Sequence, residues 1–551
     1  MYRVGEEDDE QQDSWAGDGE RGLTISRRDF LKIGGAGLAG ATLLGVASCG
    51  SGGGQGNGGG GSGGSAISNL VVGVGAEPAI LNGYVTGGDS LYTAYVTSGI
   101  LEAPLLLNPD LHYTPQLADE MPEVLSENPL AIQYRLKDGV TWSDGKPLTS
   151  ADAKWTFQQI MDPKNKIVTR TGWDKISKFE TPDERTVKIT FKEPYAPWRD
   201  LLLSSILPEH IYQNKDFNTA LNNSIMGSGA FKFKDWNKGQ SITVVRNENY
   251  WGEKAGLKSL TYRFITDSNS QIAALKAGEI SFIDPANGPG VLQQLQGIDG
   301  TTVKYKSGAS WSHMSFNTEK VDKKLRQAIA YGINRQQILS KVLKGQNVNP
   351  LQSVIVPQLK PYSTPAWSRY TYDPDNARQL VEEAKSEGAN TDLSYTTTAG
   401  VQLNTLVQQI VQQQLKDVGI NIEIANKSFT AFSQVLPGGD FEIITFGWST
   451  TGDPGVTSLF AADQVPPNGQ NYILYKNQKV TDDLHQSDVT IDAKKRTQLL
   501  HDAQNQMAED CPILPLYQLP AIYAYSSNLQ GPQVNPSLAG PYWNVGDWKV
   551  T

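Results

Sequence analysis

Short apolar and alternating runs along the chain predict β-strands of two kinds. Residues 70–74 are continuously apolar apart from one glycine, which indicates a buried strand. Residues 131–136 and 186–191 alternate apolar and polar side chains, as strands with one buried face do. Residues 421–424 and 441–446 carry similar short patterns. The chain is therefore expected to contain several strands that lie far apart in sequence.

Helical patterns lie between these strands, and capping residues mark their ends. Asn334 and Asp373 suit N-cap positions, because their side chains can accept hydrogen bonds from the first turn. The predicted helices cover residues 323–330, 334–344, 373–388 and 403–418. Strands and helices alternate without a fixed period. This mixture predicts an α/β or α+β fold with more than one lobe.

The first 48 residues predict an export signal. The heptapeptide Ser-Arg-Arg-Asp-Phe-Leu-Lys at residues 26–32 fits the twin-arginine pattern, with Arg27 and Arg28 as the paired arginines. The mildly apolar residues 33–48 follow, and they fall short of the ~20 strongly apolar residues of a membrane span. The sequence Val-Ala-Ser-Cys ending at Cys49 resembles a bacterial lipobox, which predicts cleavage before Cys49 and lipidation of its thiol.

A flexible tether is predicted directly after Cys49. Residues 50–65 contain 11 glycines among 16 residues, and such a composition cannot build a packed core. A coil of this length reaches roughly 20–25 Å, from ~5–6 Å multiplied by √n. No later segment approaches ~20 apolar residues. We therefore expect a folded body that a lipid anchors to the extracytoplasmic face of the cytoplasmic membrane.

Charge and composition narrow the possible functions. The chain has a formal net charge of −10, and residues 66–551 hold 43 basic against 49 acidic side chains. This acidic body argues against nucleic acid as a partner, since phosphate binding needs a basic surface. Two cysteines are too few for a disulfide framework, whereas 12 Trp and 22 Tyr can supply an aromatic-lined pocket.

The sequence lacks the arrangements typical of catalysis and metal binding. Residues 66–551 contain no Gly-x-Ser-x-Gly elbow, Walker loop or dinucleotide fingerprint. None of the five histidines has zinc-ligand spacing to another histidine or to a cysteine. They are His112, His210, His313, His485 and His501. We therefore predict no catalytic site, no metal and no other cofactor.

Five motifs in order along the chain resemble those of the family 5 extracellular solute-binding proteins. They are residues 134–152, which include two Asp-Gly turns, residues 227–233 with 246–251, residues 272–280, residues 316–318 with 325–335, and residues 512–517. Each motif alone is weakly specific, but together they span about residues 70–530. They consist of turns, caps and core strands, so the resemblance bears on the fold more than on the ligand.

The resemblance implies a fold like that of type II periplasmic binding proteins, with two lobes, a hinge and an extra domain on the first lobe. A ligand enclosed between the lobes favours the closed state, which the membrane subunits of an ABC importer would recognise. The implied segments are the signal (1–48), the lipidated tether (49–65), the first lobe (66–104, 225–305 and 512–551), the extra domain (105–224) and the second lobe (306–511).

The resemblance also implies ligand-binding residues in one loop of the second lobe. Gly447, Trp448 and Ser449 follow a strand whose end faces the cleft in this family. Peptide-binding relatives usually have an aspartate three residues after this tryptophan, where it pairs with the ammonium group of the peptide. This chain has Thr451 there. The loop is one residue shorter, so we expect Asp453 to substitute for that aspartate.

Further candidate residues come from distant parts of the chain. Ser90, Leu91 and Tyr92 are expected to enter the cleft from the first lobe, by their position in the family. Trp311 is expected to line the far wall. Tyr517 is expected to return close to the hinge. The predicted site therefore draws on four separate segments.

The expected function is that of a monomeric receptor, not an enzyme, which delivers a small solute or peptide to an importer. Oligopeptides are the commonest ligands of the family. Thr451 and the aromatic content favour an oligosaccharide or another polar solute instead. A metal chelate held through one histidine also stays open. A surface sensor, a structural lipoprotein and an exported enzyme are the alternatives of another class, and the enzyme lacks a candidate nucleophile with a base.

Overall fold

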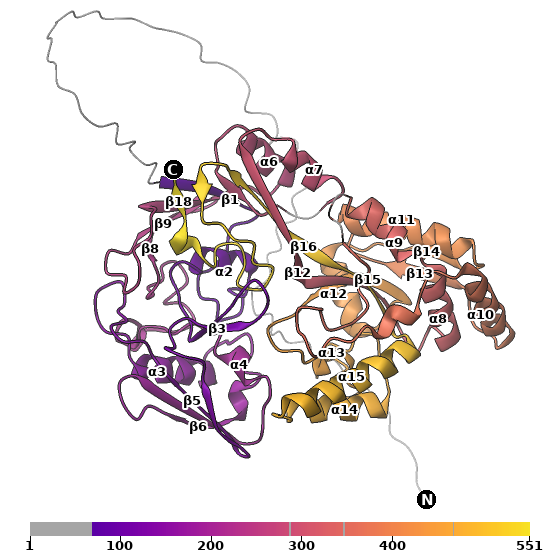
Figure 1. Cartoon of the computed structure of the whole chain (residues 1–551), viewed down its shortest axis with the longest axis horizontal. Helices are drawn as coiled ribbons and strands as arrows, with labels where there is room; N and C mark the ends of the chain where they lie inside the picture. The colour runs from indigo at the N-terminus through magenta and orange to yellow at the C-terminus, as the bar shows by residue number, and fades with distance from the viewer. Residues whose placement is uncertain (1–68, 286–287, 345, 347, 467) are drawn as a thin grey trace, which may run out of the picture. The chain divides into compact units, whose positions relative to one another are not determined.

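The computed structural model describes residues 69–551 except 286–287, 345, 347 and 467. The predicted export signal with Arg27 and Arg28, the lipidation site Cys49 and the glycine tether therefore lie outside the described residues. Within the described part, no helix combines the length and the apolar character that crossing a membrane requires. Helices and strands alternate along this part, and its larger sheets have four, four and six strands (Figure 1). The predicted mixed α/β class is confirmed.

The first lobe is built on a four-stranded sheet with the order β1-β10-β9-β8. β1 runs parallel to β10, and the other neighbours are antiparallel. The strands and helices are β1 (Asn69–Val74), α2 (Leu91–Thr97), β8 (Phe231–Asn237), β9 (Ser241–Arg246), β10 (Ser259–Phe264), α6 (Ser268–Lys276) and α7 (Val291–Gln296). The core under this sheet joins the start and the end of the described chain, because Val72 shares it with Tyr542 and Trp548.

An additional domain follows α2 in the chain. Its sheet has the antiparallel order β4-β5-β7-β6, and its separate core contains Ile132, Trp142 and Val187. Its elements, together with a neighbouring hairpin, are β2 (Leu105–Leu107), β3 (Tyr113–Pro115), β4 (Glu123–Glu127), β5 (Leu130–Arg135), α3 (Ser150–Met161), η1 (Trp173–Lys175), β6 (Ile176–Glu180), β7 (Thr186–Phe191), α4 (Trp198–Leu201) and α5 (Glu209–Tyr212). The predicted Asp-Gly turns are present, since Gly139 and Gly145 adopt φ of +70° and +88°.

The second lobe is built on part of a six-stranded sheet with the order β11-β16-β12-β15-β13-β14. The strands are β11 (Phe282–Ile283), β12 (Thr301–Phe316), β13 (Asp392–Thr396), β14 (Asn421–Ile424), β15 (Ile443–Ser449) and β16 (Ile513–Ser526). The helices are α8 (Lys323–Gly332), α9 (Arg335–Val342), η2 (Ala366–Arg369), α10 (Pro374–Ser386), α11 (Gln402–Lys416), α12 (Phe429–Gly438), α13 (Thr457–Phe460), α14 (Gln478–Asp488) and α15 (Ala493–Asp510). The chain closes with β17 (Leu529–Gln530), η3 (Val545–Asp547) and β18 (Lys549–Val550).

The helices predicted for the second lobe are present as α8 to α11, and both predicted caps form. The side chain of Asn334 accepts a hydrogen bond from the backbone of Gln337, and Asp373 accepts one from Asn376. The strand predicted at 441–446 is found at Ile443–Ser449 instead. The sequence pattern therefore predicts these elements correctly, except for the end of β15. This strand continues to Ser449 because it pairs with β12 there.

The long antiparallel strands β12 and β16 connect the cores of the two lobes. Figure 1 shows them side by side, and their pairing runs from Thr301 opposite Ser526 to Ser315 opposite Ile513. At one end Tyr523 packs in the first-lobe core, and at the other Met314 packs in the second-lobe core. The register shifts between Ser307 and Trp311. The domain boundaries implied by the resemblance stay a prediction.

Candidate functional site

A cleft of about 730 Å³ lies beside the point where β12 and β16 change register. Its lining comes from the segment after β1, from α2 and α6 of the first lobe, from the middle of both connecting strands, from the end of β15 and from the C-terminal segment. The lining residues include Gly75, Ser90, Leu91, Tyr92, Gln271, Asp284, Gly308, Ser310, Ser449, Pro520 and Leu538. Residues that are more than 400 positions apart therefore share one cavity.

The floor of the cleft is the irregular stretch of β12 at residues 308–310. The side-chain amide Nε2 of Gln518 donates to Gly308 O at 2.6 Å, and the backbone N–H of Ala309 donates to Pro536 O at 3.0 Å. A Cβ on Gly308 would lie 2.4 Å from Leu519 O, so only glycine fits there. The regular pairing of the two connecting strands is therefore interrupted at the floor of the cleft.

Ser90, Leu91 and Tyr92 line this cleft, and their contact with a ligand stays a prediction. Ser90 is the N-cap of α2, and its Oγ accepts a hydrogen bond of 3.0 Å from the backbone of Thr93. This cap fixes the start of the helix at the cleft wall. Leu91 is exposed there, and Tyr92 packs edge-to-face on Tyr95 with ring centroids 6.0 Å apart.

The end of β15 presents a free strand edge beside the cleft. β13 pairs with β15 only at Ile443 and Ile444, so no strand of the described structure lies along that side afterwards. On the other side, Thr450 N–H donates to Ala309 O at 3.2 Å. Main-chain groups of successive residues in an antiparallel ladder point alternately to its two sides. The amide and carbonyl groups of Gly447 and Ser449 therefore face the free edge, and Ser449 also lines the cleft.

The side chain of Trp448 lies on the face of β15 opposite to that of Ser449, within an aromatic cluster. Its ring stacks on those of Tyr472 and His313, with centroids 5.9 Å and 6.2 Å away and interplanar angles of 14° and 16°. The edge of Phe446 packs against it at 4.9 Å. Burial lowers the pKa of His313 to about 3, so this histidine is a neutral member of the stack. Trp448 is half-buried and packs under the free edge of β15.

Trp311, which was expected in the far wall, and Tyr517, which was expected close to the hinge, are not among the residues that line the cleft. Their exposed fractions are 2% and 0%, and both belong to the core of the second lobe. They stand on β12 and β16, where alternate side chains point to opposite faces. Trp311 pairs in register with Trp448 and packs against His313, so it strengthens the aromatic cluster and does not face a ligand.

Asp453 lines a second cavity, of about 360 Å³, between the additional domain and the second lobe, and Thr451 stands two residues before it in the same loop. Thr451 Oγ1 donates to Asp200 Oδ2 at 2.6 Å, and the hydroxyl of Tyr113 donates to Asp200 Oδ1 at 2.6 Å. Burial and the nearby carboxylate of Asp453 raise the pKa of Asp200 to about 6. The loop after β15 is therefore hydrogen-bonded to the additional domain.

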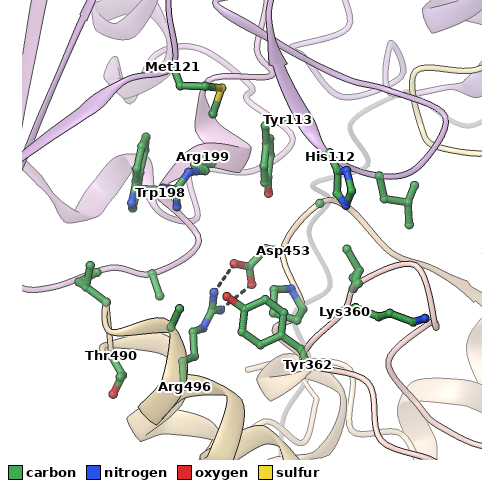
Figure 2. A pocket seen from close by; sticks show the side chains of 17 residues that line it. His112, Tyr113, Met121, Trp198, Arg199, Lys360, Tyr362, Asp453, Thr490 and Arg496 are labelled. Atoms are coloured by element: carbon green, nitrogen blue, oxygen red, sulfur yellow. Dashed lines mark hydrogen bonds and ion pairs between the residues drawn. The ribbon is translucent and has the colours of Figure 1, made fainter.

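Asp453 does not offer a free carboxylate to a ligand, contrary to the prediction. Figure 2 shows Asp453 and Arg496 pointing toward each other, with two hydrogen bonds of 2.7 Å and 2.8 Å between them. Both side chains are buried, and Asp453 Oδ1 also accepts from the backbone of Gly455 at 2.8 Å. The arginine already neutralises this carboxylate, so the amine-binding role expected of Asp453 has no support in the geometry.

Several cleft residues were not identified from the sequence, above all Asp284, Gln271 and Tyr95. Asp284 stands directly after β11, and its Oδ2 accepts a hydrogen bond of 2.7 Å from the hydroxyl of Tyr95. A polar residue directly after a short apolar strand was the signal available, but such residues are common in any sequence. Among residues 69–551, leaving aside the gaps, no group of three or more His, Cys, Asp or Glu side chains could hold a metal ion.

Comparisons with known proteins agree with this arrangement of elements. Residues 112–469 match the family described as bacterial extracellular solute-binding proteins, family 5 Middle. The chain is 27% identical over 517 residues to the oligopeptide-binding protein AppA of Bacillus subtilis strain 168, covering 87% of this chain and 91% of that protein. It is 28% identical over 492 residues to the glutathione-binding protein GsiB of Salmonella paratyphi A, covering 86% and 93%.

Two solved structures show the same fold. A periplasmic EDTA-binding protein, EppA, superposes with a TM-score of 0.80 at 22% identity and covers 88% of this chain and 97% of its own. The Bacillus subtilis protein AppA in complex with a nonapeptide superposes with a TM-score of 0.72 at 24% identity, covering 88% and 99%. The predicted type II periplasmic-binding-protein-like fold is confirmed.

Proposed function

The chain belongs to the bacterial extracellular solute-binding proteins of family 5, and from this premise we propose that it is the receptor of an ABC importer for oligopeptides. The ligand binds in the 730 Å³ cleft beside β12 and β16. Relatives that are named for oligopeptide and glutathione binding support a ligand with peptide bonds. No catalytic step is part of this proposal, which concerns binding and delivery alone.

The free edge of β15 is the observation that carries the peptide proposal. Gly447 and Ser449 turn their main-chain amide and carbonyl groups toward this edge, and Ser449 lines the cleft. An extended peptide can pair with such an edge as an additional strand, which gives affinity without dependence on side-chain sequence.

Closure of the two lobes around the peptide would couple binding to transport. The cleft is lined from both lobes, and the regular pairing of β12 and β16 is interrupted at its floor. A ligand that touches both walls binds the closed state better than the open one, and so shifts the equilibrium toward closure. The importer would then recognise the closed receptor.

The ligand class can be identified by native mass spectrometry of the protein purified from its host. We expect co-purified peptides that are released on unfolding. Thermal-shift screening with peptide pools and with cello-oligosaccharides is the complementary measurement, since a ligand at 100 times its Kd adds about 2.7 kcal/mol of stability. A bound sugar, together with no shift from any peptide pool, would replace the peptide with an oligosaccharide in this proposal.

Replacing Ser449 with proline should weaken peptide binding by roughly 2- to 10-fold, because it removes one main-chain donor from the free edge. Ser449→Ala is the matched control, since it keeps the backbone N–H and removes only the side-chain hydrogen bond of 2.7 Å to Ser310. Isothermal titration calorimetry with the co-purified peptide measures both variants. Equal affinity of the proline and alanine variants would exclude pairing at this position.

We also propose that the receptor is exported by the twin-arginine route and held at the membrane through a lipid on Cys49. The pattern around Arg27, Arg28 and Cys49 supports this, and the glycine-rich residues 50–65 would tether the folded body. Cells grown with labelled palmitate should incorporate the label into the protein, whereas a Cys49→Ala variant should carry none. Label in that variant would show that the lipid is attached elsewhere.

A further inference from the structure

The charged side chains that line the cleft are all acidic. Among its described lining residues, Asp89 and Asp284 are the ionisable carboxylic acids, and there is no lysine, arginine or histidine. Asp89 is exposed at the rim, whereas Asp284 is half-buried in the wall of the first lobe. The cleft is therefore suited to a cationic group of a ligand and disfavours an anionic one.

Asp284 accepts fewer hydrogen bonds from the described residues than the buried carboxylates Asp453 and Asp200 do. Asp453 pairs with Arg496, and Asp200 accepts two short hydrogen bonds. Among the described residues, Asp284 accepts one hydrogen bond, from the hydroxyl of Tyr95 to its Oδ2, and no lysine, arginine or histidine among them forms an ion pair with it. The other carboxylate oxygen, Oδ1, therefore has no cationic partner among the described residues. Asp284 nevertheless lines a cavity that is large enough for a ligand.

Tyrosine rings surround this carboxylate. Tyr95 packs edge-to-face on Tyr92 at 6.0 Å and against Tyr542 at 5.5 Å, and Tyr523 lines the same cleft. Burial and the charge of Asp284 raise the pKa of each of these four tyrosines, so they stay neutral. Neutral aromatic rings beside a carboxylate form a favourable site for a cation, which gains attraction from the ring faces.

A second acceptor stands on the same wall. Gln271 is 3% exposed, and its Nε2 donates to Ile265 O at 2.7 Å. Its Oε1 is buried and has no hydrogen-bond partner among the described residues, although Gln271 lines the cleft. Buried acceptors are normally satisfied, so this oxygen is consistent with a donor that a ligand brings.

We propose that Asp284 binds an ammonium group of the ligand, with Tyr92 and Gln271 beside it. This assigns the recognition of the cation to the first lobe, opposite the strand edge of β15, and not to the loop that carries Thr451 and Asp453. The ligand class is a solute with a free ammonium group, either the amino terminus of a peptide or a lysine side chain. The inference rests on the proposed function, since it concerns the same cleft.

The test uses a tryptic casein digest as the probe, in three forms. One form is untreated, one has only its α-amines acetylated, and one has all its amines acetylated. Native mass spectrometry scores the bound peptides that lack arginine. We expect the wild type to bind the untreated digest and to lose at least 10-fold when all amines are blocked, whereas the α-acetylated form decides between amino terminus and lysine.

The variant Asp284→Asn should bind the untreated digest about 10- to 100-fold more weakly and should treat all three forms alike. Asp299→Asn is the control, because Asp299 is exposed and lies outside the cleft. Circular dichroism at rising temperature should show Asp284→Asn to be folded, since it removes a half-buried charge. Tyr95→Phe, which removes the donor to Asp284 and keeps the carboxylate, should retain the preference for free amines.

The pH dependence supplies an independent readout. Burial raises the pKa of Asp284 to about 6, and the tyrosines of α2 and β16 that face it stay neutral. Peptide affinity of the wild type should therefore fall as the pH drops below about 6, and that of Asp284→Asn should not. A wild type that binds peptides regardless of acetylation and of Asp284→Asn overturns this inference. A wild type that binds no peptide in any form overturns the proposed function instead.

Discussion

Replacing Arg496 with alanine should lower the free energy of unfolding by about 3–5 kcal/mol, because it leaves the buried carboxylate of Asp453 without its partner. The two side chains share hydrogen bonds of 2.7 Å and 2.8 Å at exposed fractions of 6% and 9%. Arg496 Nε also donates to Ser487 O at 3.1 Å. Urea unfolding, followed by tryptophan fluorescence and circular dichroism, measures the loss.

Two further variants test whether the loss of stability comes from the burial of this ion pair or would follow the removal of any charge. Lys479→Ala breaks the pair of 2.6 Å on α14 between Asp483 and Lys479, whose side chain is exposed, and should cost less than about 0.5 kcal/mol. The double variant with Arg496→Met and Asp453→Leu removes both charges and should recover much of the loss, because no buried charge is left unpaired. A loss below 1 kcal/mol for Arg496→Ala would contradict the buried ion pair.

The change from Arg335 to methionine should cost about 3–4 kcal/mol, because it leaves several buried carbonyl groups without a donor. Arg335 is 6% exposed, and burial lowers its pKa to about 10, so it is still charged at neutral pH. Among the described residues, all of its hydrogen-bond acceptors are neutral groups. These are Leu351 O (2.7 Å), Pro515 O and Gln352 Oε1 (both 2.9 Å), Tyr370 O (3.2 Å) and Trp367 O (3.3 Å).

The matched control for this change is Arg378→Met, since Arg378 is an exposed arginine on α10 that contacts Asp375. We expect it to change the free energy of unfolding by no more than about 0.5 kcal/mol. Arg335→Lys keeps the charge but lacks the planar fork of donors, so its loss should fall between the two. Equal losses for Arg335→Met and Arg378→Met would show that the carbonyl contacts contribute nothing.

Both arginines hold elements that border the cleft. Arg335 connects α9 to Pro515 of β16, a strand that also lines the cleft farther along, from Leu519 to Tyr523. Arg496 of α15 fixes the loop that leaves the free edge of β15. Weaker ligand binding by either variant would therefore indicate that a wall of the cleft has moved. The affinities should be compared only at temperatures at which each variant is folded.

The residues of the chain determined much of the local structure on their own. The periodicity of residues 323–418, with caps at Asn334 and Asp373, was sufficient to place α8 to α11, because a helix end depends on side chains within one turn. Ser90 and Ser449 were expected at the cleft only because of their position in the family, and both line it.

The long connecting strand β16 could not be predicted from its pattern. It contains Pro515 and Pro520, which normally argue against a strand inside a sheet, and it is buried on both faces for most of its length. Its partners β11 and β12 supply the pairing that stabilises it. Propensity reports only on neighbours in sequence, so a strand that depends on distant partners is missed.

The chemistry of individual side chains was decided only by the tertiary structure. Sequence position suggested Asp453 as the group that binds an amine, but Arg496, 43 residues later, neutralises it. Trp311 and Tyr517 carry the right chemistry for a ligand wall, yet strand pairing turns them into the core. Asp284 has no motif around it, and the fold leaves it without a cation in the cleft. The reason is that a side chain's availability depends on which partner reaches it through space. Local sequence determines the turn or strand on which a residue stands, whereas the packing of distant segments decides whether that residue is satisfied or free to bind.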